Sequence, residues 1–201
     1  MMRYAKYSGR IAPASPPLPD DIQQAIDTLM RGAPPLVLFT TLARDPRLFF
    51  KMFDGGLLDR GNLTLRQREI VIDRVTANCR AEYEWGVHVN AFAAAAGLTT
   101  EQIRSLTVGD AGDDCWDAAD RLLIRLCDSL HRYCDVDDEL WTALTEIHSD
   151  ETVMELLMLA GVYRMISYLV NGLRLPLEPG APRFPDECHS TRRRPVTPAL
   201  P

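Results

Sequence analysis

Two adjacent helical segments in the middle of the chain constrain its fold most strongly. Thr64 and Gln67 form a capping-box pattern, which begins a helix that we expect to continue to about residue 78. The apolar residues of this helix point in several directions, as expected of a helix that is buried on all sides. A second helix is predicted over residues 81–96, before Gly97, which is a suitable left-handed cap. The first helix should therefore lie at the centre of the fold.

Helical spacing continues through most of the remaining chain. The other expected helices cover residues 20–30, 36–43, 46–58, 99–106, 113–133, 137–148 and 149–173. No run of β-branched residues bounded by turn signals indicates a strand. We therefore predict an all-α protein with three parts. These are an extended N-terminal arm (1–19), a single helical domain (20–175) and a Pro/Arg-rich C-terminal arm (176–201).

Charge and cysteine content exclude several classes of partner. A net charge of −6 argues against nucleic-acid binding, which needs a clustered positive field. No segment approaches the ~20 uninterrupted apolar residues that span a bilayer. The N-terminal region contains prolines where a signal peptide has an apolar core. Five cysteines without a Cys-x-x-Cys pair are typical of reduced thiols. We expect a cytoplasmic protein that binds neither nucleic acid nor membranes.

The second central helix places ionisable groups on an apolar face. At ~100° per residue, Glu84 and His88 lie one turn apart and within reach of each other, and Trp85 and Phe92 share their face. Glu69 begins a similar polar stripe on the preceding helix. Burying such groups is costly unless they are paired. The face therefore holds either a structural polar pair or a reactive pocket.

Acid–base chemistry and metal binding are both conceivable for these residues. A neighbouring carboxylate raises the pKa of an imidazole and burial lowers it, so the two effects together can bring it near neutrality, as general acid–base catalysis requires. Glu69, Glu84 and His88 could also supply metal ligands. Di-metal helical bundles, however, use paired Glu-x-x-His motifs, which the helical core of this chain lacks. We expect no metal and no cofactor.

The order Glu69-x11-Ala81-x2-Glu84-x3-His88 resembles the core motif of the carboxymuconolactone decarboxylase and alkylhydroperoxidase D-like superfamily. Its redox members carry Glu-x11-Cys-x2-Cys-x3-His at this place. The resemblance extends over roughly residues 36–178, with matching stretches at 44–46, 63–69, 83–85, 96–99, 161–164 and Asn171. It implies a helical bundle of the alkylhydroperoxidase D-like type.

The two motif cysteines are replaced by Ala81 and Glu84. A peroxidatic cycle needs a thiolate and a resolving thiol, and neither motif thiol is present. Cys79 is two residues out of register and should point away from the site. The resemblance therefore implies the thiol-free, decarboxylase-like branch rather than a hydroperoxidase.

This branch implies a lyase or isomerase that transfers protons on a small lactone or unsaturated acid. We expect His88 to donate the proton, Glu84 to orient it or act as partner base, and Glu69 to position the pair. The expected substrate-binding residues are Trp85, Tyr83, Phe92 and Tyr163. No obvious anion clamp is found, which favours a substrate less charged than the namesake of the family.

Two other functions remain open. The chain could be an oligomeric binding protein that kept the fold without catalysis, or a residual peroxidase that uses Cys79. The resemblance also implies a homo-oligomer, either a trimer or a hexamer. We expect the other partner to be a small-molecule substrate.

Overall fold

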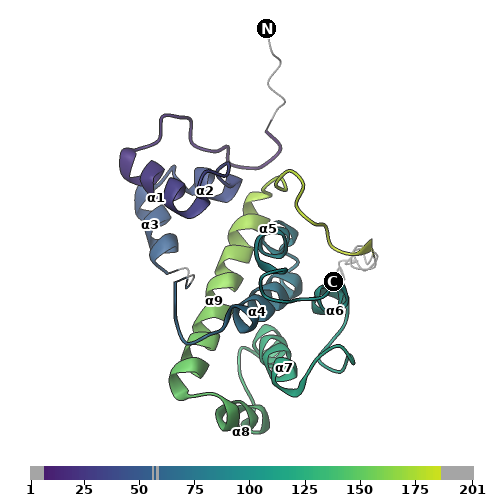
Figure 1. Ribbon diagram of the computed structural model, residues 1–201. Helices are drawn as coiled ribbons and strands as arrows, with labels where there is room; N and C mark the ends of the chain where they lie inside the picture. The colour runs from purple at the N-terminus through teal and green to yellow at the C-terminus, as the bar shows by residue number, and fades with distance from the viewer. Residues whose placement is uncertain (1–6, 56, 58, 187–201) are drawn as a thin grey trace, which may run out of the picture.

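The computed structural model describes residues 7–55, 57 and 59–186. Within these residues the chain forms helices and no strand, so the prediction of an all-α protein is confirmed (Figure 1). The helices are α1 (Asp20–Met30), α2 (Val37–Leu42), α3 (Pro46–Asp54), α4 (Leu65–Asn78), α5 (Glu82–Phe92), α6 (Thr100–Val108), α7 (Ala118–Tyr133), α8 (Asp138–Ile147) and α9 (Asp150–Leu173). The part of the C-terminal arm that begins at residue 187, which includes Cys188, lies outside the described residues.

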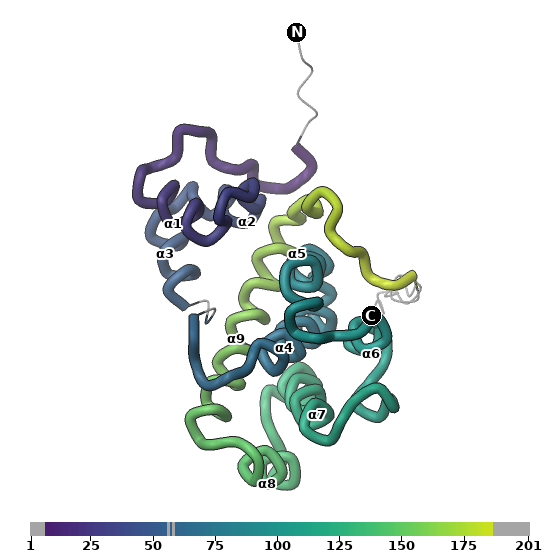
Figure 2. The backbone as a smooth tube through the Cα atoms, viewed as in Figure 1, coloured from purple at the N-terminus to yellow at the C-terminus, as the bar shows by residue number. Residues whose placement is uncertain are grey.

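Helix α4 is the centre of the bundle and packs against α5, α6, α7 and α9 (Figures 1 and 2). All nine residues from Glu69 to Ala77 are buried, as the distribution of its apolar residues predicts. The capping box is formed: the Thr64 hydroxyl accepts a hydrogen bond from the Gln67 backbone N–H at 3.2 Å. The Gln67 side chain in turn accepts one from the Thr64 N–H at 2.9 Å. The sequence thus determines both the start and the surroundings of this helix.

Three helix boundaries differ from the prediction by about four residues, and one of them is the end of α3, which lies at Asp54 rather than at residue 58. Helix α5 ends at Phe92 rather than near residue 96, because hydrogen-bonded turns carry the chain to Gly97, which has the left-handed φ of 67°. Helix α7 begins after Asp117 rather than at residue 113. Asp117 accepts a hydrogen bond from the Asp120 N–H, whereas the carboxylate of Asp113 is occupied by the Ser105 hydroxyl. The start of α7 is therefore set by a capping partner that local spacing does not reveal.

Helices α1–α3 form a separate layer beside the end of the bundle where α5 and α9 lie (Figures 1 and 2). Hydrogen bonds join this layer and the preceding segment to the bundle. The Leu38 N–H donates to the Tyr83 hydroxyl at 3.1 Å, and the Arg10 N–H donates to the Leu173 carbonyl at 2.8 Å. Residues 7–19 contain no helix.

The segment after α9 crosses the outer side of α5 (Figure 1). Its backbone approaches so closely that a Cβ at Gly86 would lie 2.7 Å from the Pro182 carbonyl oxygen. Glu82 fixes the segment by accepting hydrogen bonds from the Arg183 side chain and from the Phe184 N–H. A glycine at position 86 is therefore required by this contact.

Helix α9 is the one helix in the described residues that is long and apolar enough to cross a membrane. Its most apolar window is 44% buried inside the protein, and it packs against α4, α5 and α8.

Candidate active site

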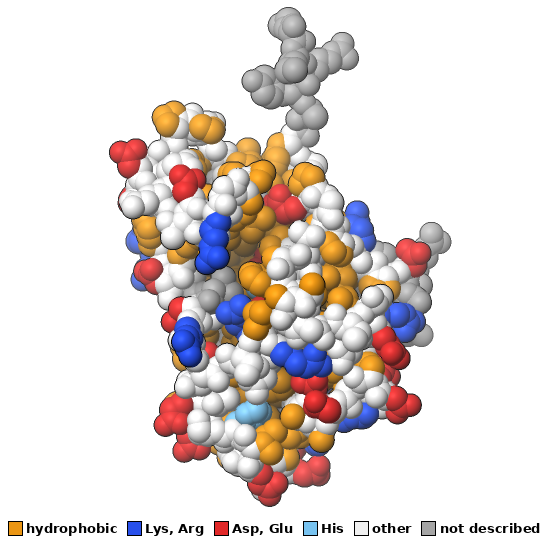
Figure 3. Space-filling view, in the orientation of Figure 1, with side chains coloured by type: hydrophobic (Ala, Val, Ile, Leu, Met, Phe, Trp, Pro, Cys, Tyr) orange, Lys and Arg blue, Asp and Glu red, His pale blue; other side chains and the backbone are white. Residues whose placement is uncertain are grey.

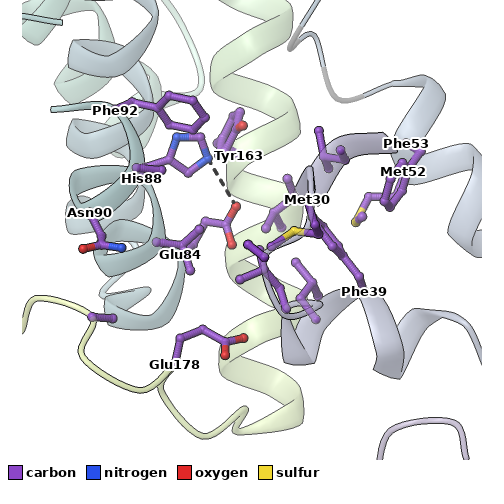
Figure 4. Close-up of a pocket in the computed structure, with 18 of the residues that line it drawn as sticks. Met30, Phe39, Met52, Phe53, Glu84, His88, Asn90, Phe92, Tyr163 and Glu178 are labelled. Carbon is purple, nitrogen blue, oxygen red and sulfur yellow. Dashed lines mark ion pairs between the residues drawn. The ribbon is translucent and has the colours of Figure 1, made fainter. Parts of the chain in front are cut away.

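A cavity of about 440 Å³ lies between the layer α1–α3 and the bundle helices α5 and α9 (Figure 4). Its walls are mainly apolar and include Met30, Phe39, Met52 and Phe53. Its polar groups come from Glu84, His88, Asn90 and Glu178. On the face drawn in Figure 3, the molecule is hollowed between the N-terminal helices and the bundle, and hydrophobic side chains surround an acidic group there. The volume is in the range of small-molecule sites.

The His88 imidazole lies between two carboxylates. Its Nδ1 is 2.8 Å from Oε2 of Glu69, which α4 contributes from the buried centre of the bundle. Its Nε2 is 3.6 Å from Oε1 of Glu84, one turn earlier on α5. Because the carboxylates face opposite ring nitrogens, the three groups do not converge on one point. In the described part of the chain, no group of three or more potential ligands could hold a metal ion.

The charge state of His88 follows from these neighbours. Burial lowers the pKa of His88, but the hydrogen bonds and negative charges of Glu69 and Glu84 outweigh it and raise the pKa to about 10. The imidazole is therefore protonated at neutral pH. The expected near-neutral pKa is not found, because the ring has two carboxylate partners rather than one.

The two glutamates differ in what they can reach. Glu69 is fully buried and bonded to both His88 and the Arg68 side chain, so it fixes the imidazole from behind. Glu84 lines the cavity, and its Oε2 is buried without a hydrogen-bond partner. Glu69 thus contacts the ring from the core, and Glu84 is the glutamate that faces the cavity. The packing of α4 against α5 decides which glutamate contacts the ring most closely. Spacing along one helix cannot show this packing.

A further acid, Asp73, lies one turn after Glu69 on α4. Both of its carboxylate oxygens are buried without a partner. Burial raises the pKa of Asp73 well above its usual value. Burial therefore disfavours the charged form of the Asp73 carboxyl group.

Two of the four expected substrate-binding aromatic residues line the cavity. Tyr163 stands perpendicular to the His88 ring at 5.0 Å between centroids, and Phe92 lies 5.4 Å from it. Trp85 is instead buried against Phe184, with ring centroids 5.0 Å apart. Trp85 shares the face of α5 that carries His88 in a helical projection. The segment after α9 nevertheless covers it.

Tyr83 is the other expected residue that does not line the cavity. Its hydroxyl donates a hydrogen bond to Glu178, which does line it. Neither Glu178 nor the apolar residues of α1–α3 were found by sequence reasoning. They lie far along the chain from His88, and no local pattern signals which face of α1–α3 meets the bundle.

Comparison with known proteins shows what the segment that holds this site is similar to. Residues 46–125 match the carboxymuconolactone decarboxylase family, and this range contains Glu69, Glu84 and His88. Solved structures with the alkylhydroperoxidase D-like fold are also similar. A peroxidase-related protein from Ralstonia eutropha JMP134, with an alkylhydroperoxidase core, has a TM-score of 0.76 at 20% identity; the match covers 87% of this chain and 95% of that one.

The match to the family model lies within residues 46–125, and the fold of the chain is similar to the alkylhydroperoxidase D-like fold. A peroxidase-related protein from Silicibacter sp. TM1040 has a TM-score of 0.73 at 16% identity, over 89% of this chain and 97% of that one. The debrominase Bmp8 in complex with 2,3,4-tribromopyrrole has a TM-score of 0.67 at 12% identity, over 84% and 91%. At these identities the structures show the fold alone. No curated protein matches the chain.

The chain lacks both thiols of the redox motif, since Ala81 and Glu84 stand in their places. Cys79 is half-buried at the end of α4 and does not belong to the cavity wall. Burial raises the pKa of its thiol, which disfavours the reactive thiolate. Arg74 on α4 and Arg164 on α9 do not line the cavity either.

Proposed function

We propose that this protein is a cofactor-free lyase or isomerase that transfers protons on a small carbonyl compound. The observation that carries the proposal is the free Oε2 of Glu84, which is buried and belongs to a side chain lining the cavity. Buried polar atoms almost always have a partner, so an exception at a cavity wall suggests that a bound molecule supplies it. The protonated His88 beside Glu84 supports the same proposal.

In an isomerisation, the Glu84 carboxylate takes a proton from the carbon beside the substrate carbonyl. The electron pair of that C–H bond moves to the carbonyl oxygen and forms an enolate. Glu84 then returns the proton to a different carbon, so no proton is gained or lost overall. The His88 imidazolium stabilises the negative charge near Glu84, and Glu69 holds the ring in place.

A decarboxylation would use the same groups for protonation alone. The electron pair of the breaking C–C bond moves towards the carbonyl as carbon dioxide leaves, and an enolate remains. His88 then supplies a proton to that carbon through Glu84, and water restores the imidazolium while its hydroxide combines with the released carbon dioxide as bicarbonate. Both reactions need only proton carriers, which this trio contains.

The debrominase structure supports a small ligand for this fold, since that protein is in complex with a brominated pyrrole. The alternative of a non-catalytic binding protein shares the cavity but needs no proton carrier. The alternative of a thiol peroxidase is opposed by the place and the raised pKa of Cys79. We also propose, as the resemblance implies, that the protein acts on a small molecule as a cytoplasmic homo-oligomer. The four described cysteines are free thiols, which supports that location.

A turnover assay separates these functions. Small lactones and unsaturated carbonyl compounds are incubated with wild-type protein, Glu84→Gln and Glu146→Gln, and products are followed by NMR. Glu146 is exposed on α8, away from the cavity, so its variant makes the same charge change as a control. We expect about 10²–10⁴-fold lower turnover in Glu84→Gln alone. Equal rates in all three proteins would contradict the proposal, as would dithiol-dependent hydroperoxide turnover that Cys79→Ser abolishes.

A further inference from the structure

We infer that this cavity takes uncharged molecules that carry a hydrogen-bond donor and rejects anions, and that Glu178 is a specificity-determining residue. The inference deepens the proposed function, on which it rests, by naming the class of substrate. It concerns the part of the cavity that Glu178 lines, beyond the trio of Glu69, Glu84 and His88.

Glu178 lies in the segment after α9 and is held in position by two other elements. Its Oε1 accepts a hydrogen bond from the Val37 N–H of α2 at 2.6 Å and another from the Tyr83 hydroxyl of α5. Both bonds use the same oxygen, which leaves Oε2 available as an acceptor. A carboxylate fixed in this way can receive a donor from a ligand without reorganising.

In Figure 4, Glu84 lies between His88 and Glu178, and the apolar side chains of α1–α3 face them. The cavity thus has two acceptors along one wall, the free Oε2 of Glu84 and the carboxylate of Glu178. A hydroxyl or N–H group on a ligand would give one of them a partner. A molecule without a donor would leave both oxygens unpaired on burial, which costs free energy.

Charge in the cavity disfavours anions. Its wall contains the carboxylates of Glu84 and Glu178 and, among the described residues, no Lys or Arg. The single positive charge, on His88, already faces the two carboxylates of Glu69 and Glu84. A ligand carboxylate would be desolvated among apolar side chains and repelled by like charges.

The charge and the hydrogen-bond acceptors of the cavity distinguish between the two substrate classes that the sequence suggests, lactones and unsaturated acids. A neutral lactone that bears a hydroxyl group satisfies the acceptors and introduces no charge. An unsaturated acid is a carboxylate at neutral pH. In the cavity it would face the two carboxylates of Glu84 and Glu178. The structure therefore favours the lactone class, and with it isomerisation over decarboxylation, whose substrate carries a carboxylate.

Binding of matched naphthalene probes tests the inference. The probes are 2-naphthalenemethanol (neutral donor), 2-(methoxymethyl)naphthalene (neutral, no donor) and 2-naphthoate (anion), each titrated against the full chain at pH 7 by ligand-observed NMR. We expect the alcohol to bind wild-type protein at least about tenfold more tightly than either of the others. Equal affinities for alcohol and naphthoate would overturn the inference.

Glu178→Gln then assigns the effect to one residue. This variant should improve naphthoate binding about tenfold relative to the alcohol, because one negative charge is removed. Glu146→Gln, which changes net charge equally on the exposed surface of α8, should leave the ratio unchanged. An identical ratio in the two variants would contradict the role of Glu178.

These outcomes are independent of catalysis. If Glu178→Gln does not fold, as judged by circular dichroism and thermal melting, the wild-type ratios still decide the ligand class and Glu84→Gln provides the second charge deletion. Binding requires no turnover, so a protein that prefers the alcohol but turns over no substrate would contradict the proposed function alone. One that turns over a lactone but binds naphthoate equally well would contradict only this inference.

Discussion

Among the single residues, His88 determines the electrostatics of the site, because both of its ring nitrogens face carboxylates. The sequence predicts the trio of Glu69, Glu84 and His88 from spacing and from the family motif. It does not predict which glutamate bonds the ring, since that depends on how closely α4 and α5 pack. The 2.8 Å and 3.6 Å distances settle the assignment in favour of Glu69.

The raised pKa of His88 predicts how stability varies with pH. Its folded-state pKa of about 10 lies above the ordinary value of 6.5, so protonation stabilises the folded state. This contribution is complete below about pH 6.5 and is lost as pH rises towards 10. The free energy of unfolding of wild-type protein relative to His88→Gln should thus fall by a few kcal/mol over that range. Denaturant titrations at several pH values measure it, and a constant difference would contradict the ion pair.

Glu69 should act on the reaction only through His88. Glu69→Gln keeps a side-chain oxygen near Nδ1 but removes the negative charge, so the pKa of His88 should fall. Nitrogen-15 NMR titration of the imidazole measures that pKa. We expect turnover to decrease about 10-fold to 100-fold, with a shifted pH profile. An unchanged imidazole titration would show that Glu69 does not set the charge of His88.

Among the elements, the layer α1–α3 has the largest consequence for function, because it closes one side of the cavity. The sequence predicts its helices, as Asp45, which accepts a hydrogen bond from the Leu48 N–H, illustrates for the start of α3. It does not predict what they cover. Apolar periodicity shows that a face is buried but does not identify the surface that buries it.

The Tyr83 hydroxyl should hold this layer to the bundle. Tyr83→Phe removes the donor to Glu178 and the acceptor of the Leu38 N–H. We expect faster amide hydrogen exchange in α2, with a local loss of about 1–2 kcal/mol, and no change in α4. Tyr133→Phe is the matched control, because Tyr133 is 71% exposed. Equal protection of the α2 amides in both variants would show that the Tyr83 hydroxyl does not hold α2 to the bundle.

For the whole molecule, the exposed face of α9 is the best candidate for the expected homo-oligomer contact. Met154, Met158, Met165 and Tyr168 are exposed on this helix. Gly161 lies midway between them, and a Cβ there would meet nothing within 4 Å. Two copies crossing antiparallel at Gly161 would pair Met158 with Met165 and Met154 with Tyr168. Such a contact has twofold symmetry. Of the two expected assemblies, the hexamer is the one that fits a twofold contact.

Light scattering coupled to size-exclusion chromatography measures this assembly. Wild-type protein should elute as an even-numbered oligomer, and Met158→Glu should reduce its mass by burying a charge at the contact. Leu48→Glu places the same charge on exposed α3 and should leave the mass unchanged. A monomeric wild-type protein, or an oligomer unaffected by Met158→Glu, would contradict the assignment.

The central claim is that Glu84 and His88 move protons to and from carbon in this cavity, and solvent deuterium incorporation measures that event directly. A neutral lactone that binds is incubated with the protein in D₂O, and proton NMR follows the signal of the carbon beside its carbonyl. We expect wild-type protein and Glu146→Gln to catalyse the exchange, and Glu84→Gln to catalyse it about 10²-fold or more slowly. Exchange at the same rate with Glu84→Gln, or none with wild-type protein while the lactone is bound, would contradict it.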